Sequence, residues 1–157
     1  MFWIQLSIGL IAVALLIAAF VFFSKRMREH RRVASIDAAR KVFSERREWL
    51  EADFWKMGAN SGKPRGLEWE NCDFDSDVQF ARDRSNGDLT AFVGVSIKFR
   101  AIEGGGMEDV PAVANQKAAT AVFRFDGEKW EATGKTVFNL NPTQAIEYYQ
   151  NELESVQ

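Results

Sequence analysis

Residues 70–103, ENCDFDSDVQFARDRSNGDLTAFVGVSIKFRAIE, contain the strongest signal for the fold. Asn86-Gly87 is typical of a two-residue type I′ turn, and runs of β-forming residues flank it on both sides. A two-residue loop gives one almost wholly apolar face and brings opposite charges together on the other face. The predicted cross-strand pairs are Phe80 with Val93, Val78 with Val95, Ser76 with Ile97, Phe74 with Phe99, Asp75 with Lys98, Asp73 with Arg100, and Asp77 with Ser96.

A second hairpin is predicted around Asp126-Gly127, between the runs 118–125 and 130–138. A four-residue loop, Asp126 to Lys129, would pair Phe125 with Trp130 and Arg124 with Glu131, so it brings opposite charges together. The two hairpins are joined by about fifteen residues that begin with Gly104-Gly105-Gly106. This connection is long for a hairpin protein, and we expect it to be the most mobile or functional loop.

Two helices are expected, one before the first hairpin and one after the second. Ser35 can cap a helix from Ile36 to Met57 that Gly58 would end, and apolar residues recur on it at three- and four-residue spacing except at Arg46 and Arg47. A final helix opens at Asn141, Pro142 and Thr143. The apolar positions are Ile36, Ala39, Phe43, Leu50, Phe54 and Met57 on the first helix, and Ile146, Tyr149 and Leu153 on the last.

These elements predict an α+β domain over residues 35–157, in which one helix packs on a four-stranded antiparallel meander and a C-terminal helix follows. A helix followed by a curved meander resembles the cystatin-like and NTF2-like folds, over roughly Ser35 to Phe138. Phe-Arg-Phe-Asp-Gly-Glu-Lys-Trp at 123–130 is similar to a hairpin often seen in NTF2-like domains. The expected aromatic core residues are Phe43, Trp49, Phe54, Phe74, Phe80, Phe99, Phe123, Phe125, Trp130 and Phe138.

The N-terminal residues predict a membrane anchor. Phe2 to Phe23 is a run of 22 residues without a charge. Such a run forms roughly 33 Å of helix, which matches the apolar thickness of a bilayer. It lacks the basic start and the small-residue end of a cleaved signal peptide. We therefore assign residues 1–24 to a retained transmembrane anchor and residues 25–34 to a basic juxtamembrane segment.

The basic segment predicts the orientation. It contains Lys25, Arg26, Arg28, Arg31 and Arg32 against one acid, Glu29, whereas Val33 to Gln157 carries 15 basic and 21 acidic residues. Positive charge beside a span stays in the cytoplasm, so the C-terminal domain is predicted to be cytoplasmic. The five basic residues serve as this topology signal or also contact anionic lipid headgroups. The acidic remainder disfavours a nucleic-acid partner.

Three sequence features resemble sites of metal binding, phosphate binding or catalysis, and none of them meets the requirements of such a site. Asp73-Phe-Asp75-Ser-Asp77 resembles the start of a calcium loop, but Val78 and Arg84 stand where that loop needs glycine and glutamate. Gly104 to Gly106 lacks the residues of a phosphate loop. Cys72, the sole cysteine, forms no intrachain disulfide, lacks a histidine base within the domain, and is predicted to be a buried structural thiol. We expect no catalytic residue, cofactor or metal site.

The predicted register places Phe92 on the outer face of the sheet, near Ala81 and Gly94. These three residues are a candidate interface, and ordinary exposure or cover by the C-terminal helix are the alternatives. NTF2-like domains commonly dimerise through this face, so the resemblance implies a homodimer as one option. The leading hypothesis is a non-enzymatic, membrane-tethered interaction or scaffolding module with an unidentified protein partner. The alternative is an NTF2-like small-ligand-binding domain or enzyme that uses a cavity between helix and sheet.

Overall fold

The computed structural model describes residues 35–60 and 66–156. The predicted anchor and basic juxtamembrane segment lie outside these ranges, as do the five basic residues expected near the lipid. No helix within the described residues has the length and hydropathy needed to cross a bilayer. By its contacts the chain separates into Met1–Lys41 and Val42–Gln157. Residues 35–41 of the first part are helical. The second part contains the sheet.

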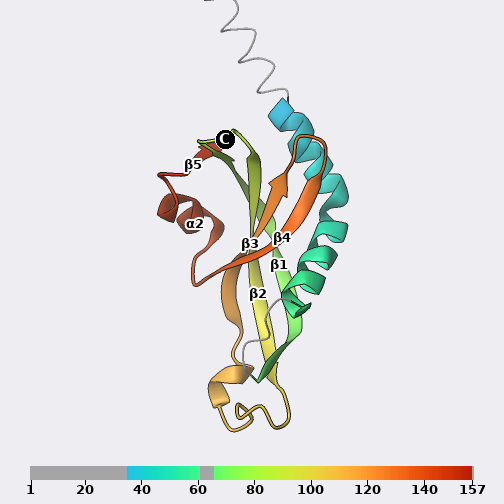
Figure 1. Cartoon of the computed structure of the whole chain (residues 1–157), viewed down its shortest axis with the longest axis vertical. Helices are drawn as coiled ribbons and strands as arrows, with labels where there is room; N and C mark the ends of the chain where they lie inside the picture. The colour runs from blue at the N-terminus through green and yellow to red at the C-terminus, as the bar shows by residue number, and fades with distance from the viewer. Residues whose placement is uncertain (1–34, 61–65, 157) are drawn as a thin grey trace, which may run out of the picture. The chain divides into compact units, whose positions relative to one another are not determined.

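The sheet is antiparallel, curled and five-stranded, and its strand order is β4-β3-β2-β1-β5 (Figure 1). The α+β class is therefore confirmed, whereas the prediction of four strands is wrong. The strands are β1 (Leu67–Asp83), β2 (Leu89–Ala101), β3 (Lys117–Phe125), β4 (Trp130–Phe138) and β5 (Leu153–Val156). A short 3-10 helix, η1 (Pro111–Ala114), lies in the connection between β2 and β3, and the helix α2 (Pro142–Tyr148) precedes β5.

The long helix continues through Gly58 to residue 60, so the prediction that Gly58 ends it is wrong. Gly58 is buried against the indole of Trp69 on β1. A Cβ atom at position 58 would lie 2.6 Å from that ring. The absence of a side chain therefore allows a close approach between the helix and the sheet, rather than a left-handed helix end.

Aromatic rings pack between residues 42–60 of the long helix and the inner face of the sheet. Phe43 is 1% exposed and meets Phe80, Phe123 and Trp130 with ring centroids 5.0–5.7 Å apart. Phe54 is fully buried and contacts the rings of Trp69, Phe74 and Phe123. Edge-to-face contacts of this kind add to the stabilisation from burial. This part of the predicted core is confirmed.

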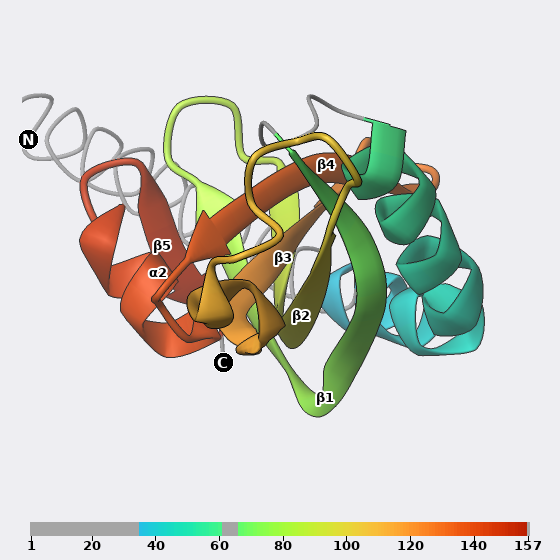
Figure 2. The ribbon, with the colours of Figure 1, turned by 90° about the horizontal axis from the view of Figure 1, so that it is seen from below.

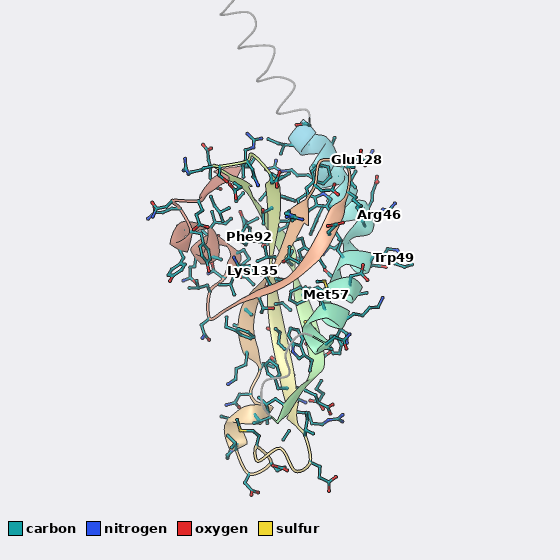
Figure 3. All side chains as sticks on the ribbon, viewed as in Figure 1. Arg46, Trp49, Met57, Phe92, Glu128 and Lys135 are labelled. Atoms are coloured by element: carbon teal, nitrogen blue, oxygen red, sulfur yellow. The ribbon has the colours of Figure 1, made fainter. Side chains whose placement is uncertain are left out.

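Three predicted apolar positions are wrong, because their side chains lie at the surface. Trp49 is 75% exposed, Phe138 44% and Met57 41%. Arg46 and Trp49 project from the side of the long helix that faces away from the sheet (Figure 3). Leu50 and Phe54, one turn apart, supply the inner face at this level.

The first hairpin differs from the predicted register. Its loop has four residues, Arg84 to Gly87, and the Asp83 amide donates to the Asp88 carbonyl at 2.9 Å. The Asp83 carboxylate accepts hydrogen bonds from the backbone amides of Ser85 and Asn86 and from the Ser85 hydroxyl. These bonds stabilise the longer turn and hold the pKa of Asp83 below its usual range, the Ser85 hydroxyl having the largest effect.

This two-residue difference changes every predicted pair in the hairpin. Phe80 lies opposite Ala91, and two irregularities further along β1 shift the register again. Lys98 and Arg100 still meet carboxylates, but their partners are Glu70 at 2.9 Å and Glu68 at 2.5 Å. The predicted pairs of Lys98 with Asp75 and of Arg100 with Asp73 are therefore wrong.

The second hairpin is confirmed. Phe125 pairs with Trp130 and Arg124 with Glu131, across the loop Asp126 to Lys129. The Asp126 carboxylate accepts from the amides of Lys129 and Glu128, at 2.8 and 2.9 Å. The Lys129 amide has the larger effect in lowering the pKa of Asp126.

The helix α2 partly covers the outer face of the sheet, on the opposite side from residues 42–60 of the long helix (Figure 2), and β5 pairs with the edge of β1. Asn141 caps α2 through a reciprocal capping box with Gln144, and Pro142 opens the helix as predicted. The helix ends at Tyr148, because the chain turns there and Leu153 bonds back to the Tyr149 carbonyl at 2.8 Å. Leu153 is therefore the first residue of β5, and the prediction that it belongs to the final helix is wrong.

Candidate functional site

Phe92 and Ala81, two of the predicted interface residues, lie in a buried cluster beneath α2. Phe92 is 3% exposed and Ala81 is fully buried. Ala145 and Ile146 of α2 pack against them, and Val122 of β3, the cross-strand partner of Phe92, lies beside them. Phe92 is labelled in Figure 3. Of the three interpretations of Phe92, the structure shows cover by the C-terminal helix. Because both residues are buried, they do not present an open interface.

Gly94, the third predicted interface residue, marks a different feature. It lies between Val93 and Val95, whose partners on β1 are Val78 and Phe74, so residues 75–77 of β1 lie opposite Gly94 alone. This is a β-bulge, a feature that bends a strand and redirects its side chains. Sequence analysis rejected the carboxylates of this stretch as a calcium loop and missed the bulge that they form.

Arg47 of the long helix holds the bulge from the inner side. Its guanidinium donates to the carbonyl of Ser76 at 2.6 Å and to the carbonyl of Asp75. The same side chain donates to the Glu51 carboxylate at 2.6 Å. The gap that Arg47 makes in the apolar stripe is therefore explained, because its fork of donors satisfies two strand carbonyls at the bulge.

The Asp75 side chain extends over the outer face of the sheet. A methyl group at Gly94 would overlap the Asp75 carboxylate, so glycine leaves the space in which that carboxylate lies across β2. The backbone of Asp75 is held by Arg47 on one side of the sheet, and its side chain projects on the other. The bulge therefore fixes a single carboxylate over a glycine.

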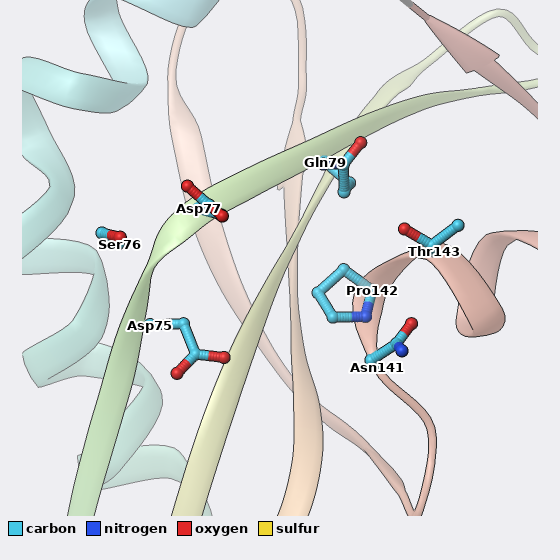
Figure 4. A pocket seen from close by; sticks show the side chains of 7 residues that line it. All are labelled: Asp75, Ser76, Asp77, Gln79, Asn141, Pro142 and Thr143. Atoms are coloured by element: carbon cyan, nitrogen blue, oxygen red, sulfur yellow. The ribbon is translucent and has the colours of Figure 1, made fainter.

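Two adjoining hollows share Asp75, Asn141 and Pro142, and we call them together the Asp75 groove. The first has a volume of about 400 Å³ and lies between the bulge and the start of α2, where Ser76, Asp77, Gln79 and Thr143 complete its lining (Figure 4). The second has a volume of about 410 Å³. It is lined also by Gly94, Val95, Ser96, Ala118, Ala119, Asn139, Leu140 and Gln144.

The wall formed by residues 139–142 is fixed to β3. Asn139 adopts a left-handed conformation with φ 62°, and its amide donates to the Ala118 carbonyl at 2.9 Å. The fully buried hydroxyl of Thr120 donates to the Leu140 carbonyl at 2.7 Å. The Asp75 groove is therefore held by hydrogen bonds on its bulge side and on its α2 side.

A third hollow lies beneath the connection between β2 and β3. Its volume is about 330 Å³, and Lys98, Arg100, Met107, Val110 and Val113 contribute to its lining. The connection contains η1, and the Glu108 carboxylate accepts from the Gly104 amide. Lys98 pairs with Glu70 within this lining, and Arg100 pairs with Glu68, so both cations of the hollow already have carboxylate partners.

Cys72 is half-buried, not fully buried as predicted. Burial raises the pKa of its thiol to about 12, and the nearby charges of Asp73 and Glu51 act in the same direction. A thiol is a nucleophile only as its thiolate. Cys72 is therefore suited to packing and not to chemistry at neutral pH.

No family model, curated protein or solved structure matches the chain in comparisons with known proteins. In residues 35–60 and 66–156, histidine, cysteine and carboxylate side chains form no group of three that could hold a metal ion. The Asp75 groove is therefore the candidate site, because hydrogen bonds hold its walls on both sides of the Asp75 carboxyl group.

Proposed function

We propose that this chain is a non-enzymatic, membrane-tethered module that binds a partner protein through the Asp75 groove on the cytoplasmic side. The tether and the orientation rest on the uncharged run at residues 2–23 and on the five basic residues that follow it. The binding surface rests on the groove, whose walls are held in place on both sides.

The packing between helix and sheet favours an interaction module over a small-ligand-binding domain or enzyme. An NTF2-like ligand-binding domain or enzyme would need a cavity between the long helix and the sheet. Phe43 and Phe54 fill that region with ring contacts to five aromatic side chains of the sheet. We also propose that the domain has a cystatin-like or NTF2-like fold, which the packing of residues 42–60 of the long helix on a curled antiparallel sheet supports.

Photocrosslinking in cells tests the binding surface. A photoreactive phenylalanine replaces Thr143, which is exposed at the rim of the groove, or Glu128, which is exposed in the β3–β4 loop outside it. We expect one discrete crosslinked product from position 143 and none from position 128. Equal crosslinking at both positions, or none at either, would contradict the proposal. A product of twice the chain's mass would identify a second copy as the partner.

Labelling with a membrane-impermeant maleimide tests the orientation. Glu128→Cys provides the probe. Asn86, which is also exposed in a hairpin loop, is less suitable because its side chain makes hydrogen bonds with Asp88. Cys72 contributes little background because its thiol has a raised pKa. We expect labelling only after the membrane is permeabilised, and labelling of intact cells would place the domain outside.

A further inference from the structure

The part of the Asp75 groove above Gly94 contains one formal charge. Among the described residues that line this hollow, Asp75 is charged and the others are neutral. Its carboxylate lies over the glycine, at the point where the two hollows meet. A ligand that occupies either hollow would therefore contact the same negative group.

Asp75 has no cationic partner in the described chain. The ion pairs formed by residues 35–60 and 66–156 do not include it. Lys98, which the predicted register assigned to it, is bound to Glu70 at 2.9 Å. Arg47 binds the backbone carbonyl of Asp75 on the far side of the strand and not its carboxylate. The charge is therefore available to a cation from outside.

The neutral walls favour a cation that carries an aliphatic stem. Ala118, Leu140 and Pro142 supply apolar surface next to the carboxylate. Lysine and arginine side chains bury their methylene groups along such surfaces while the charged end meets a polar partner. A phosphate or nucleic-acid ligand is disfavoured by the negative charge in the floor.

We propose that the Asp75 groove binds an arginine or lysine side chain from an extended basic segment of a partner protein. The cationic group pairs with the Asp75 carboxylate, and its stem lies against Ala118, Leu140 and Pro142. The adjoining hollow, lined also by Asp77, Gln79 and Thr143, offers a second carboxylate and neutral polar groups to the segment (Figure 4). This inference rests on the proposed function and names the chemistry of the partner.

The test is a titration of the full chain, ¹⁵N-labelled in detergent micelles, with three synthetic peptides. Each has capped ends and the sequence Gly-Ala-X-Ala-Gly, where X is arginine, lysine or citrulline, which resembles arginine but has no charge. We expect saturable shifts of the Gly94, Ser96 and Ala118 amide signals with arginine and lysine. With citrulline we expect shifts at least about threefold weaker at the same concentration, since an exposed ion pair contributes up to about 1 kcal/mol.

Two substitutions two residues apart on β1 provide the matched comparison. Asp75→Asn removes the one charge that lines both hollows, whereas Asp73→Asn removes a charge that lines neither. We expect about three- to fivefold weaker binding of the arginine peptide for Asp75→Asn and less than twofold for Asp73→Asn. Gly94→Ala, whose methyl group displaces the carboxylate, is expected to weaken binding as Asp75→Asn does.

Three results would overturn the inference: equal binding of citrulline and arginine, equal effects of Asp75→Asn and Asp73→Asn, or shifts confined to residues outside the groove. Arginine amide that binds as tightly as the peptide would also overturn it, because the site would then take a free small cation. If position 143 still crosslinks a partner while Asp75→Asn has no effect, the inference fails and the proposed function stands. If position 143 gives no crosslink in the chain that keeps Asp75, the proposed function itself fails.

Discussion

Arg47 joins the long helix to β1 through two backbone carbonyls at the bulge, and its side chain is 22% exposed. Replacing it by methionine keeps the stem but leaves both carbonyls without these donors. We predict that Arg47→Met lowers the free energy of unfolding by about 1.5–3 kcal/mol, the range for hydrogen bonds to charged groups. Urea denaturation followed by tryptophan fluorescence measures the change.

Arg46 is the control for this prediction. It precedes Arg47 directly but points to solvent from the outer side of the helix (Figure 3). Arg46→Met should change the free energy of unfolding by no more than about 0.5 kcal/mol, as is usual for surface substitutions. If both variants lower the free energy of unfolding by similar amounts, the cause is the removal of a positive charge from the helix and not the loss of the contact with the bulge.

The raised pKa of Cys72 gives a prediction about how fast its thiol is alkylated. Its pKa of about 12 means that at pH 8 only roughly one molecule in ten thousand is ionised. We expect alkylation by iodoacetamide to be at least about 100-fold slower at Cys72 than at a cysteine introduced in place of Glu128. Comparable rates at pH 8 would mean that the thiol is not shielded.

The same thiol links stability to pH. An unfolded chain loses this proton near pH 8.5, well before the folded chain does. The unfolded state is therefore favoured as the pH rises from about 8.5 towards 12, and below that window the thiol contributes no pH dependence. Cys72→Ser should reduce the loss of stability in this range when urea midpoints are compared at pH 8 and 10.

At the level of elements, Gly58 and Trp69 determine how closely the helix approaches the sheet. Alanine is the better helix former by about 1 kcal/mol. Its methyl group would nevertheless lie 2.6 Å from the Trp69 ring. We predict that Gly58→Ala lowers the free energy of unfolding by about 1–3 kcal/mol through overpacking. In a Trp69→Leu background the same change should be neutral or stabilising, and a loss that persists there would exclude the ring as the cause.

The helix α2 determines which part of the outer sheet face is covered. Ile146 is 7% exposed and packs with Ala81, Phe92 and Val122. Ile146→Asp would place a charge in this cluster, so we predict that α2 detaches and that Phe92 becomes exposed. Increased binding of a hydrophobic dye, with the inner aromatic core still folded by near-ultraviolet circular dichroism, would show this. Glu147→Asp, at an exposed position on the same helix, is the control.

The two hairpins show what local sequence could and could not predict. The second was predicted with its correct pairs, because Asp126 caps a turn whose residues are adjacent in sequence. The first was misjudged, because Asn86-Gly87 suggested a short loop while Asp83 holds a longer one. The bulge at residues 75–77 depends on Arg47, which is 28 positions from Asp75. Such a contact has no signature within the hairpin itself.

For the molecule as a whole, the class of fold was predictable and the site was not. Apolar residues three and four apart indicate the long helix, alternating apolar residues indicate the strands, and the positions of most aromatic core residues follow from these two patterns. The Asp75 groove, by contrast, needs β1, β2, β3 and the start of α2 together. The choice between an interface, ordinary exposure and cover by the C-terminal helix at Phe92 stayed open for the same reason, because the position of α2 over the sheet is a tertiary property.

The proposed membrane tether leads to a prediction about the molecule as a whole. Replacing Leu15 and Leu16 by lysine puts two charges near the centre of the uncharged run. Each costs about 2.5–3.5 kcal/mol at the centre of a spanning helix. We predict that the natural chain stays in the membrane pellet after extraction at alkaline pH and that the double variant is released. Release of both proteins, or retention of both, would contradict the predicted anchor.

The pairing of β5 with only the last part of β1 has a consequence for self-stacking. β5 pairs with Phe80 to Asp83, and Arg47 binds the carbonyls of Asp75 and Ser76, so the straight unpaired edge of β1 is limited to its first residues. Straight, unpaired strand edges are the templates on which identical segments assemble into fibrils. Arg47→Met would lengthen that edge, so on storage this variant should form fibrils that bind thioflavin T sooner than the natural chain does.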